Sequence, residues 1–385
     1  MLSALRIDRL GALLTAVGAA ALVCLPFVVF KQNRILPGDA LSLYAVLPPL
    51  AAYACLAALL VTAIAALLVH DARIRFGVAL LGIVMLAAAV AAAGNALTPP
   101  GNRVVRVAPG AGCWLLLVTL MLMATDALTR LKPRPLTRVL LLAVCAVGAG
   151  IALAHGIFDH LSVMREYAVN SERFGRELQR HLWLALGSLG AALCFALPLG
   201  MLCHRVPRLR AGTLGVLNLV QTIPAIALFG ILMAPLAALA ANVPLAARLG
   251  IHGIGAAPAV IALFLYSLLP IVANTVTGLA RVSPAAVEAA RGMGMTPGQV
   301  LARVEMPLAL PVMLSGVRIV LVQNIGLATI AALIGAGGLG AFVFQGIGQT
   351  AIDLVLLGAI PTVVMAFAAS VLLDALVETM DRTPQ

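Results

Sequence analysis

Long apolar runs separated by short polar segments dominate this chain, and the pattern predicts membrane-spanning helices. A bilayer hydrocarbon core of ~30 Å is crossed by about twenty residues of α-helix. The alternating segments of roughly ten residues that are typical of transmembrane barrels are absent from the sequence. Several runs contain at least twenty residues without Asp, Glu, Lys or Arg, among them Leu10–Phe30, Leu182–Cys203, Ala211–Ala247, Ile319–Ile352 and Leu354–Leu373. We therefore predict an all-α integral membrane protein.

The apolar pattern predicts ten spans, and the basic residues predict their orientation. With both termini placed in the cytoplasm, sixteen of the 25 Lys and Arg residues fall in inner segments and nine in outer segments. Four of those nine lie in segment 159–180 beside four acidic residues, so this outer segment is nearly neutral. The excess of positive charge on inner segments predicts cytoplasmic termini and a cytoplasmic segment 281–307. The ten spans are expected near residues 9–30, 44–69, 76–94, 109–128, 138–157, 182–204, 213–236, 257–277, 313–335 and 353–374.

Charge and cysteine content narrow the classes of function. The net charge is +11, but the basic residues are dispersed over short inner segments, so topology explains the charge better than nucleic-acid binding does. The six cysteines have no CxxC spacing and lie within or at the edge of spans, which favours apolar packing over metal binding. Most of the six histidines lie at span ends, where interfacial positions are expected. We predict neither a metal site nor a nucleic-acid partner.

The chain divides into two regions by the polarity of its spans. Residues 1–160 carry five spans rich in Ala, Leu and Val with few polar side chains, and their function is unknown. Asp126 is the exception; near the inner end of its span it is expected to reach interfacial water rather than to carry protons. Residues 161–385 carry the other five spans and most of the polar residues within spans.

Segment 281–307, RVSPAAVEAARGMGMTPGQVLARVEMP, is a polar stretch between two apolar runs, and its residues predict a short helical hairpin. Ser283-Pro284 is typical of a helix start, with a capping hydroxyl followed by a proline at the first helical position. Gly292 and Gly294 can end that helix, because glycine adopts the left-handed conformation at little cost. Thr296 and Gln299 have the spacing of a capping box that opens a second helix.

The spacing within this segment resembles the EAA loop of ABC-importer permeases, the membrane subunits that take up solutes delivered by a binding protein. The matching positions are Glu288-Ala289-Ala290, Gly294 and Val304-Glu305-Met306-Pro307. The resemblance implies that the hairpin fits a groove of a partner ATPase. The alternative is a solvated loop without a partner. The residues that the resemblance assigns to ATPase coupling are Glu288, Ala289, Ala290, Gly292, Gly294 and Pro307.

The resemblance extends over about residues 161–385 and is closest to the osmoprotectant branch, whose members import glycine betaine, choline, carnitine or related compounds. It implies a type I ABC-importer permease core in a bacterial inner membrane. It also implies a second permease subunit, the same or paralogous, together with two cytoplasmic ATPase subunits and a periplasmic binding protein. The five N-terminal spans resemble only the longer members of the branch. The segments that carry the resemblance are 181–205, 216–232 with Gln221-Thr222-Ile223-Pro224 at its centre, 266–279 and 327–347.

The sequence excludes an ATP-binding P-loop in this chain. G-x-x-x-x-G-K-[ST] requires a lysine after a glycine, and the two lysines, Lys31 and Lys132, follow Phe30 and Leu131. ATP and magnesium are therefore expected on the partner ATPase, with no cofactor and no enzymatic site in this chain. The sequence of residues 335–340 satisfies G-x-G-x-x-G, but it follows a predicted span rather than a strand. We interpret it as a helix end where the backbone bends or packs closely.

Polar residues within the core spans are candidates for the substrate pathway. Such residues either line a cavity or join helices through hydrogen bonds worth ~0.6 to 2 kcal/mol, and both alternatives stay open. Quaternary ammonium groups are usually held by aromatic cages, and only 4% of this chain is aromatic. High-affinity recognition is therefore expected in the separate binding protein. The pathway candidates are Gln221, Thr222, Asn274, Gln323 and Asn324, with Asn218 beside them.

Three alternative functions are compatible with parts of this pattern. A permease of the same fold for methionine, a phosphonate or a sulfonate would share the EAA loop. An ATP-independent secondary transporter or channel would need several acidic residues or broken helices at mid-membrane, and only Asp126 and Asp353 lie near spans. A membrane enzyme would need a nucleophile–base or metal constellation, and none is evident in the sequence.

Overall fold

The computed structural model describes residues 8–33, 36–99, 101–102 and 104–380. The chain forms two compact units. The N-terminal unit comprises residues 1–134 and 144–169, and the core unit comprises residues 135–143 and 170–385. Within the described residues, nine helices are long and apolar enough to cross a membrane.

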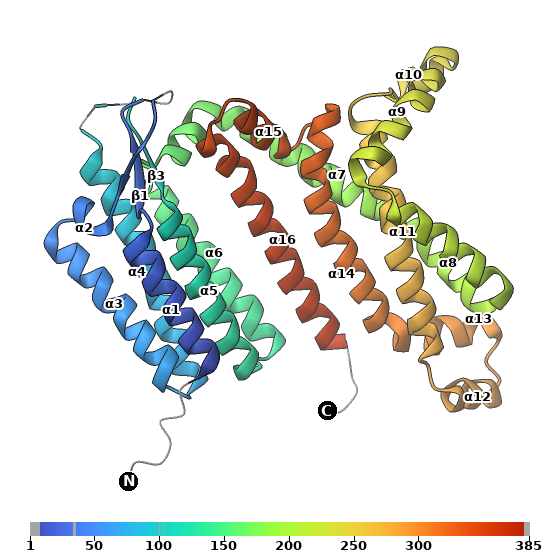
Figure 1. The fold of residues 1–385 in the computed structure, drawn as a ribbon. Coiled ribbons are helices and arrows are strands. Elements are labelled where there is room, and N and C mark those ends of the chain that lie inside the picture. Colours follow the sequence, from blue (N-terminus) through green and yellow to red (C-terminus); the bar gives the residue numbers. More distant parts are fainter. Residues whose placement is uncertain (1–7, 34–35, 100, 103, 381–385) are drawn as a thin grey trace, which may run out of the picture. The chain divides into compact units, whose positions relative to one another are not determined.

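The N-terminal unit is a helical bundle with a small sheet at one end (Figure 1). The sheet is antiparallel, with strand order β2-β1-β3 and Val28 paired to both Leu41 and Pro109. Its elements are α1 (Arg9–Cys24), β1 (Val28–Lys31), β2 (Asp39–Leu41), α2 (Leu43–Val46), α3 (Pro49–Leu68), α4 (Ala72–Leu97), β3 (Arg106–Pro109) and α5 (Ala111–Leu131). A further helix, α6 (Pro135–Ala154), has residues in both units and no buried residue.

The first predicted span is shorter than expected. The sequence pattern placed a helix over residues 9–30, but α1 ends at Cys24 and the chain enters β1 at Val28. Leu25 precedes Pro26 and is extended, with φ −117° and ψ 150°, because the proline ring disfavours the helical conformation of the residue before it. The sheet was not predicted, since its first strand continues an apolar run.

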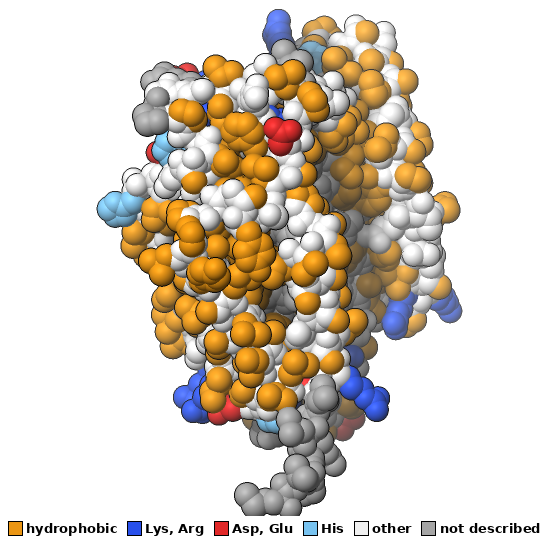
Figure 2. Space-filling model, turned by 60° about the vertical axis from the view of Figure 1, so that its left-hand side comes forward, with side chains coloured by type: hydrophobic (Ala, Val, Ile, Leu, Met, Phe, Trp, Pro, Cys, Tyr) orange, Lys and Arg blue, Asp and Glu red, His pale blue; other side chains and the backbone are white. Residues whose placement is uncertain are grey.

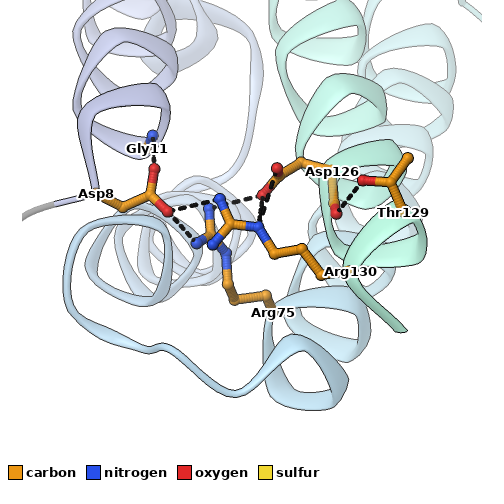
Figure 3. A network of polar contacts seen from close by, with 6 residues as sticks. All are labelled: Asp8, Gly11, Arg75, Asp126, Thr129 and Arg130. Atoms are coloured by element: carbon orange, nitrogen blue, oxygen red, sulfur yellow. Dashed lines mark hydrogen bonds and ion pairs between the residues drawn. The ribbon is translucent and has the colours of Figure 1, made fainter. Parts of the chain in front are cut away.

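An ion-pair network closes the end of the N-terminal unit opposite the sheet (Figure 3). Arg75 is fully buried, and its guanidinium lies 2.7 Å from the Asp8 carboxylate and 3.2 Å from that of Asp126. Arg130 contacts the same two carboxylates at 2.7 and 3.0 Å. The pKa of Asp8 is held well below its usual range, first by the Gly11 N–H and then by the two guanidinium groups. Asp126, which was expected to reach interfacial water, is 13% exposed and pairs with both arginines.

The core unit contains the remaining elements except the first eight residues of α7, which belong to the N-terminal unit, and two regions differ from the prediction. The predicted span 213–236 is broken at Ile223-Pro224, because proline has no N–H to continue the helix. Segment 159–180, expected as a loop, is largely helical. The elements are α7 (Ser162–Arg205, non-helical at Asn170), α8 (Pro207–Thr222), α9 (Ala225–Asn242), α10 (Pro244–Arg248), α11 (Ala256–Ala280), α12 (Pro284–Gly292), α13 (Pro297–Val300), the π-helix η1 (Leu301–Glu305), α14 (Met306–Ile330), the 3-10 helix η2 (Ala331–Ile334), α15 (Gly340–Gly348) and α16 (Ile352–Met380).

Close contact between α11 and α14 forms the centre of the core unit. A Cβ atom at Gly316 would lie 2.8 Å from the Asn274 Cβ and 2.9 Å from the Pro270 carbonyl oxygen. Likewise, a Cβ atom at Gly278 would lie 2.9 Å from the Ala309 carbonyl oxygen. Small residues at such crossings let two membrane helices approach at backbone distance.

Apolar side chains cover most of the molecular face shown in Figure 2, and charged side chains are few and lie toward its ends. Val23 is 81% exposed on α1, and Leu50 is 83% exposed on α3. Apolar exposure of this extent is expected where lipid rather than water is the surrounding solvent.

Candidate functional site: the coupling hairpin

Segment 281–307 forms the predicted helical hairpin. α12 ends at Gly292, and Gly294 adopts a left-handed conformation with φ 83°. The capping box is confirmed, because the Thr296 hydroxyl accepts from the Gln299 N–H while the Thr296 N–H donates to the Gln299 side chain at 2.9 Å. One detail of the prediction is wrong: Ser283 precedes α12 as expected, but its hydroxyl makes no capping hydrogen bond.

The hairpin has a buried side and an exposed side. Ala290 is 1% exposed and packs inward. Glu288 and Ala289 are exposed, as is Met293 at 72%. Glu288 and Ala289 are thus accessible to another protein, while Ala290 packs against the rest of its own unit.

The two predicted glycines differ in what they require. A side chain at Gly292 would meet no atom within 4 Å, and its φ is not positive. Gly294 is also open in space, but its φ of 83° strains any L-residue placed there. Gly294 is therefore the position at which substitution would change the angle between α12 and α13.

A polar hollow of about 240 Å³ lies between the hairpin and the helices that flank it. It brings Glu288 and Arg291 of α12 near His204 of α7 and Glu305 of η1. Glu305 is 7% exposed and forms an ion pair of 2.9 Å with Arg205 at the end of α7. The hairpin segment is therefore linked to α7 by a charged pair and continues through η1 into α14.

The turn before α14 is a π-helix. This conformation is rare in proteins, and where it occurs it is often found at a functional site. The Met306 N–H bonds to the Leu301 carbonyl, five residues back. Pro307 has no N–H to donate to the Arg303 carbonyl, so the α-helical pattern is interrupted at this point. Sequence reasoning named Pro307 but missed the π-helix and the Arg205–Glu305 pair. Pro307 was the one local signal that could have predicted the π-helix.

The pathway candidates are bonded to separate partners. Asn324 is fully buried and donates to the hydroxyls of Ser188 and Ser267 at 3.0 Å each, joining α14 to α7 and α11. Gln221 donates to the Tyr266 carbonyl at 2.8 Å. For these two residues the contacts favour helix bridging, the second of the two alternatives.

The other pathway candidates are less enclosed. Asn274 donates to the Pro270 carbonyl of its own helix at 2.8 Å. Thr222 is exposed and bonds to the Leu219 carbonyl at 2.7 Å. Gln323 is half-buried, and Asn218 is exposed. Lining of a pathway stays a prediction for these positions.

The glycine-rich segment 335–340 bends the backbone as expected. Gly335, Gly337 and Gly338 have φ values of 77°, 76° and 85°. A Cβ atom at Gly340 would collide with the Thr329 carbonyl oxygen, so this position requires close backbone packing.

The first half of α7 holds this bend in place, which sequence reasoning missed. The Glu177 carboxylate accepts from the Gly338 N–H at 2.6 Å. Buried His181 accepts from the Leu339 N–H at 3.3 Å through Nδ1, and its Nε2 lies 3.0 Å from the Ile325 carbonyl. His181 was expected at an interface, but it bridges two backbone groups instead.

Comparison with known proteins assigns these features to a family. Residues 196–383 match the family described as binding-protein-dependent transport system inner membrane component. Osmoprotectant import permease protein OsmW of Salmonella typhimurium is 45% identical over 197 residues, which cover 51% of this chain and 86% of that protein. The chain belongs to this permease family. It is accordingly a multi-pass membrane permease of the type I ABC-importer fold.

Two further relatives of the permease carry substrate names. Carnitine transport permease protein OpuCD of Listeria monocytogenes is 40% identical over 216 residues, covering 56% of this chain and 90% of that protein. Choline transport system permease protein OpuBD of Bacillus subtilis is 41% identical over 213 residues, covering 55% and 87%. Among solved structures, an inward-facing MetNI methionine ABC transporter aligns with TM-score 0.48 and 21% identity, covering 54% of this chain and 96% of that one.

The N-terminal part of the permease matches a different description. Residues 8–164 match the N-terminal domain of ABC transporter permease YehY. The N-terminal and C-terminal parts of the chain thus match two different family descriptions.

Proposed function

We propose that this permease carries an osmoprotectant such as glycine betaine, choline or carnitine across a bacterial inner membrane. The observation that carries the proposal is the 45% identity over 86% of a permease named for osmoprotectant import. Relatives named for carnitine and choline support the same chemical class. A permease for methionine, a phosphonate or a sulfonate is the competing substrate class within this fold.

The proposed energy source is a separate ATPase that acts on the coupling hairpin. In the proposed mechanism, nucleotide binding draws two ATPase subunits together, and each holds one hairpin through the exposed side that contains Glu288 and Ala289. Ala290 and the Arg205–Glu305 pair pass the displacement to α7 and α14. Gly292, Gly294 and Pro307 set the angles between hairpin and spans. A periplasmic binding protein that binds one state of the permease better than the other would shift the population between states.

The proposed assembly contains two permease subunits, which are the same or paralogous, two ATPase subunits and a binding protein. We propose residues 161–385 as the permease core and residues 1–160 as an additional membrane region. Both termini and the hairpin are proposed to be cytoplasmic, in line with the excess of basic residues on those segments. Gln221, Thr222, Asn274, Gln323 and Asn324 are proposed near the pathway, with specificity residing mainly in the binding protein.

Uptake of radiolabelled glycine betaine tests this function. The chain is expressed with its neighbouring ATPase and binding-protein genes in a strain that lacks osmoprotectant uptake. Accumulation that is competed by choline or carnitine, and not by methionine, a phosphonate or a sulfonate, is the expected result. Accumulation that persists without the ATPase would instead identify a secondary transporter.

A further inference from the structure

An apolar slot that is open on one side lies among the helices of the N-terminal unit, and the proposed transport mechanism does not use it. Its volume is about 460 Å³, roughly three times the ~150 Å³ of a protein cavity that binds benzene. Its walls come from α1, α3 and α5, with Tyr44 of α2 at one end. The slot lies wholly among helices of one unit.

The slot is closed at the end nearer the ion-pair network. α1 and α3 touch there, because a Cβ atom at Gly11 would collide with the Ala66 carbonyl oxygen. The slot begins one turn further along α1, at Leu14, and Met123 of α5 lies at the same end. Both side chains are buried, at 5% and 3% exposure, and both line the slot.

The slot opens toward the surface that faces the bilayer. Two residues of its wall, Tyr44 and Leu60, are 60% and 61% exposed. The neighbouring side chains Leu13 and Val23 of α1 are 60% and 81% exposed and apolar. Lipid is therefore the medium at the mouth of the slot, and a tyrosine at the edge of a span is typical of the membrane interface.

The length of the slot matches a hydrocarbon chain lying along the helices. On α1 it extends from Leu14 to Leu22, which is about 12 Å at 1.5 Å per residue. On α5 it extends from Leu116 to Met123, which is about 10 Å. One leaflet contributes about 15 Å of a hydrocarbon core of ~30 Å.

The wall offers almost no hydrogen bonds to a ligand. The hydroxyls of Thr62 and Thr119 already donate to the carbonyls of Ala58 and Leu115 in their own helices, at 2.7 Å each. The Thr15 hydroxyl is buried without a partner in the described structure. Among the described residues, Thr15 and Tyr44 are the hydroxyl-bearing lining residues for which no hydrogen bond is found, and Tyr44 lies at the exposed end. A wall that is otherwise apolar suits a hydrocarbon chain better than a polar solute.

We infer that the slot binds one acyl chain of a membrane phospholipid, with the chain end between Leu14 and Met123 and the headgroup on the Tyr44 side. The inference is independent of the transported substrate. It assigns a lipid site to a region that carries no coupling residue.

Photolabelling in lipid nanodiscs tests the site with the full chain. The probe is a palmitoyl-oleoyl phosphatidylethanolamine with a diazirine at the end of one acyl chain. We expect labelling of Met123 in the wild type, and loss of that labelling when the diazirine is moved next to the glycerol. Labelling of lipid-facing Val23 without labelling of Met123 would overturn the proposal, and a helix of another chain filling the slot would give this outcome.

A matched pair of variants on α3 sharpens the test. Ala57 lines the slot, whereas Ala54, one turn away and also exposed, does not. Ala57→Phe should reduce labelling of Met123 at least fivefold, and Ala54→Phe should leave it unchanged. Equal labelling in the two variants would overturn the proposal. Thr15→Val should also leave labelling unchanged; a loss would show that the ligand needs the hydroxyl and is not a plain acyl chain.

Discussion

The two units of this permease handle polar groups in different ways. The N-terminal unit pairs fully buried Arg75 with Asp8 and Asp126, pairs Arg106 with buried Glu166 separately, and has an apolar slot elsewhere. The core unit joins its helices through neutral hydrogen bonds, as at Asn324, and pairs its buried Glu305 with Arg205 beside the hairpin. Neutral bonds worth about 1 kcal/mol can be exchanged during a conformational change, whereas a buried ion pair opposes one. We therefore expect the core unit, which is bridged at Asn324 by neutral bonds, to change conformation more readily than the N-terminal unit around Arg75.

The largest expected effect is at the hairpin. Gly294→Asp should reduce uptake and its coupling to ATP hydrolysis at least tenfold, because an L-residue is strained at a φ of 83°. Glu288→Lys should do the same by reversing an exposed charge that we propose to contact the ATPase. Uptake of radiolabelled substrate and membrane content of the chain are measured together.

Gly298→Asp is the matched control for the hairpin. Gly298 lies in the same hairpin, is exposed, and has neither a positive φ nor a neighbour within 4 Å. Its uptake should stay within twofold of wild type. Normal uptake in Gly294→Asp would refute the coupling role. An equal loss of uptake in Gly294→Asp and Gly298→Asp would show that the left-handed conformation at Gly294 is not what matters.

The second effect tests the rigidity of the N-terminal unit. Arg75→Leu leaves the carboxylates of Asp8 and Asp126 partly unpaired and should destabilise this unit by about 3 to 5 kcal/mol. Labelling of buried Cys55 and Cys113 by a thiol reagent during heating reports this unit, and Cys203 reports the core unit.

Arg130→Leu serves as the control, because the Arg130 side chain is 39% exposed and a partly exposed pair contributes about 0 to 1 kcal/mol. The temperature at which half of Cys55 is labelled should fall clearly in Arg75→Leu and only slightly in Arg130→Leu. An equal fall for Cys203 would contradict the separation of the two units.

A smaller effect is expected at the link between hairpin and spans. Arg205→Gln removes the ion pair with Glu305 and should lower substrate molecules transported per ATP about two- to fivefold, without changing folding. Arg205→Lys should restore most of the ratio, since it retains the charge. Arg208→Gln, at an exposed position on the next helix, should have no effect. Wild-type stoichiometry in Arg205→Gln would show that the pair has no part in coupling.

Asn324→Ala should have a modest effect on stability. The hydroxyls of Ser188 and Ser267 also donate to the carbonyls of Leu184 and Leu263 at 2.6 Å, so the alanine variant leaves them partnered. The expected loss is about 0.6 to 2 kcal/mol in thermal unfolding. A loss comparable with that of Arg75→Leu would contradict the contrast between the two units.

The smallest effect concerns pH. The lowered pKa of Asp8 means that its contribution to stability is complete above the unfolded-state pKa of ~3.9 and is lost only as pH falls through the lower folded-state value. The unfolding midpoint of the N-terminal unit, read from Cys55, should therefore be unchanged between pH 8 and pH 5 as far as Asp8 contributes. In Asp8→Asn the midpoint should be lower at both values by the same amount.

Local signals account for what the sequence predicted. The helix-forming run after Pro284, the glycine at position 294 and the Thr296–Gln299 capping box each act within a few residues, and the structure has all three. The strand at Val28–Lys31 was missed because a short apolar run has the same pattern in a strand and in a helix. Pro26 was the signal that a helix should end there.

Contacts between distant residues account for what the sequence did not predict. Asp8 and Arg75 are separated by 67 positions, and Glu177 and Gly338 by 161, so no periodicity relates them. The hydrogen bonds of Asn324 with Ser188 and Ser267 likewise join residues that are far apart in the sequence. The hairpin could be recognised from its own residues, whereas its connection to α7 depended on tertiary structure.

The central claim is that this permease moves substrate only when a separate ATPase acts on the hairpin. Reconstitution of the chain with its ATPase and binding protein in proteoliposomes tests it directly, with radiolabelled glycine betaine outside and ATP inside. We predict accumulation with ATP and none with a non-hydrolysable ATP analogue, and none with ATP in Gly294→Asp. Accumulation without hydrolysis, or at wild-type rate in Gly294→Asp, would contradict the account.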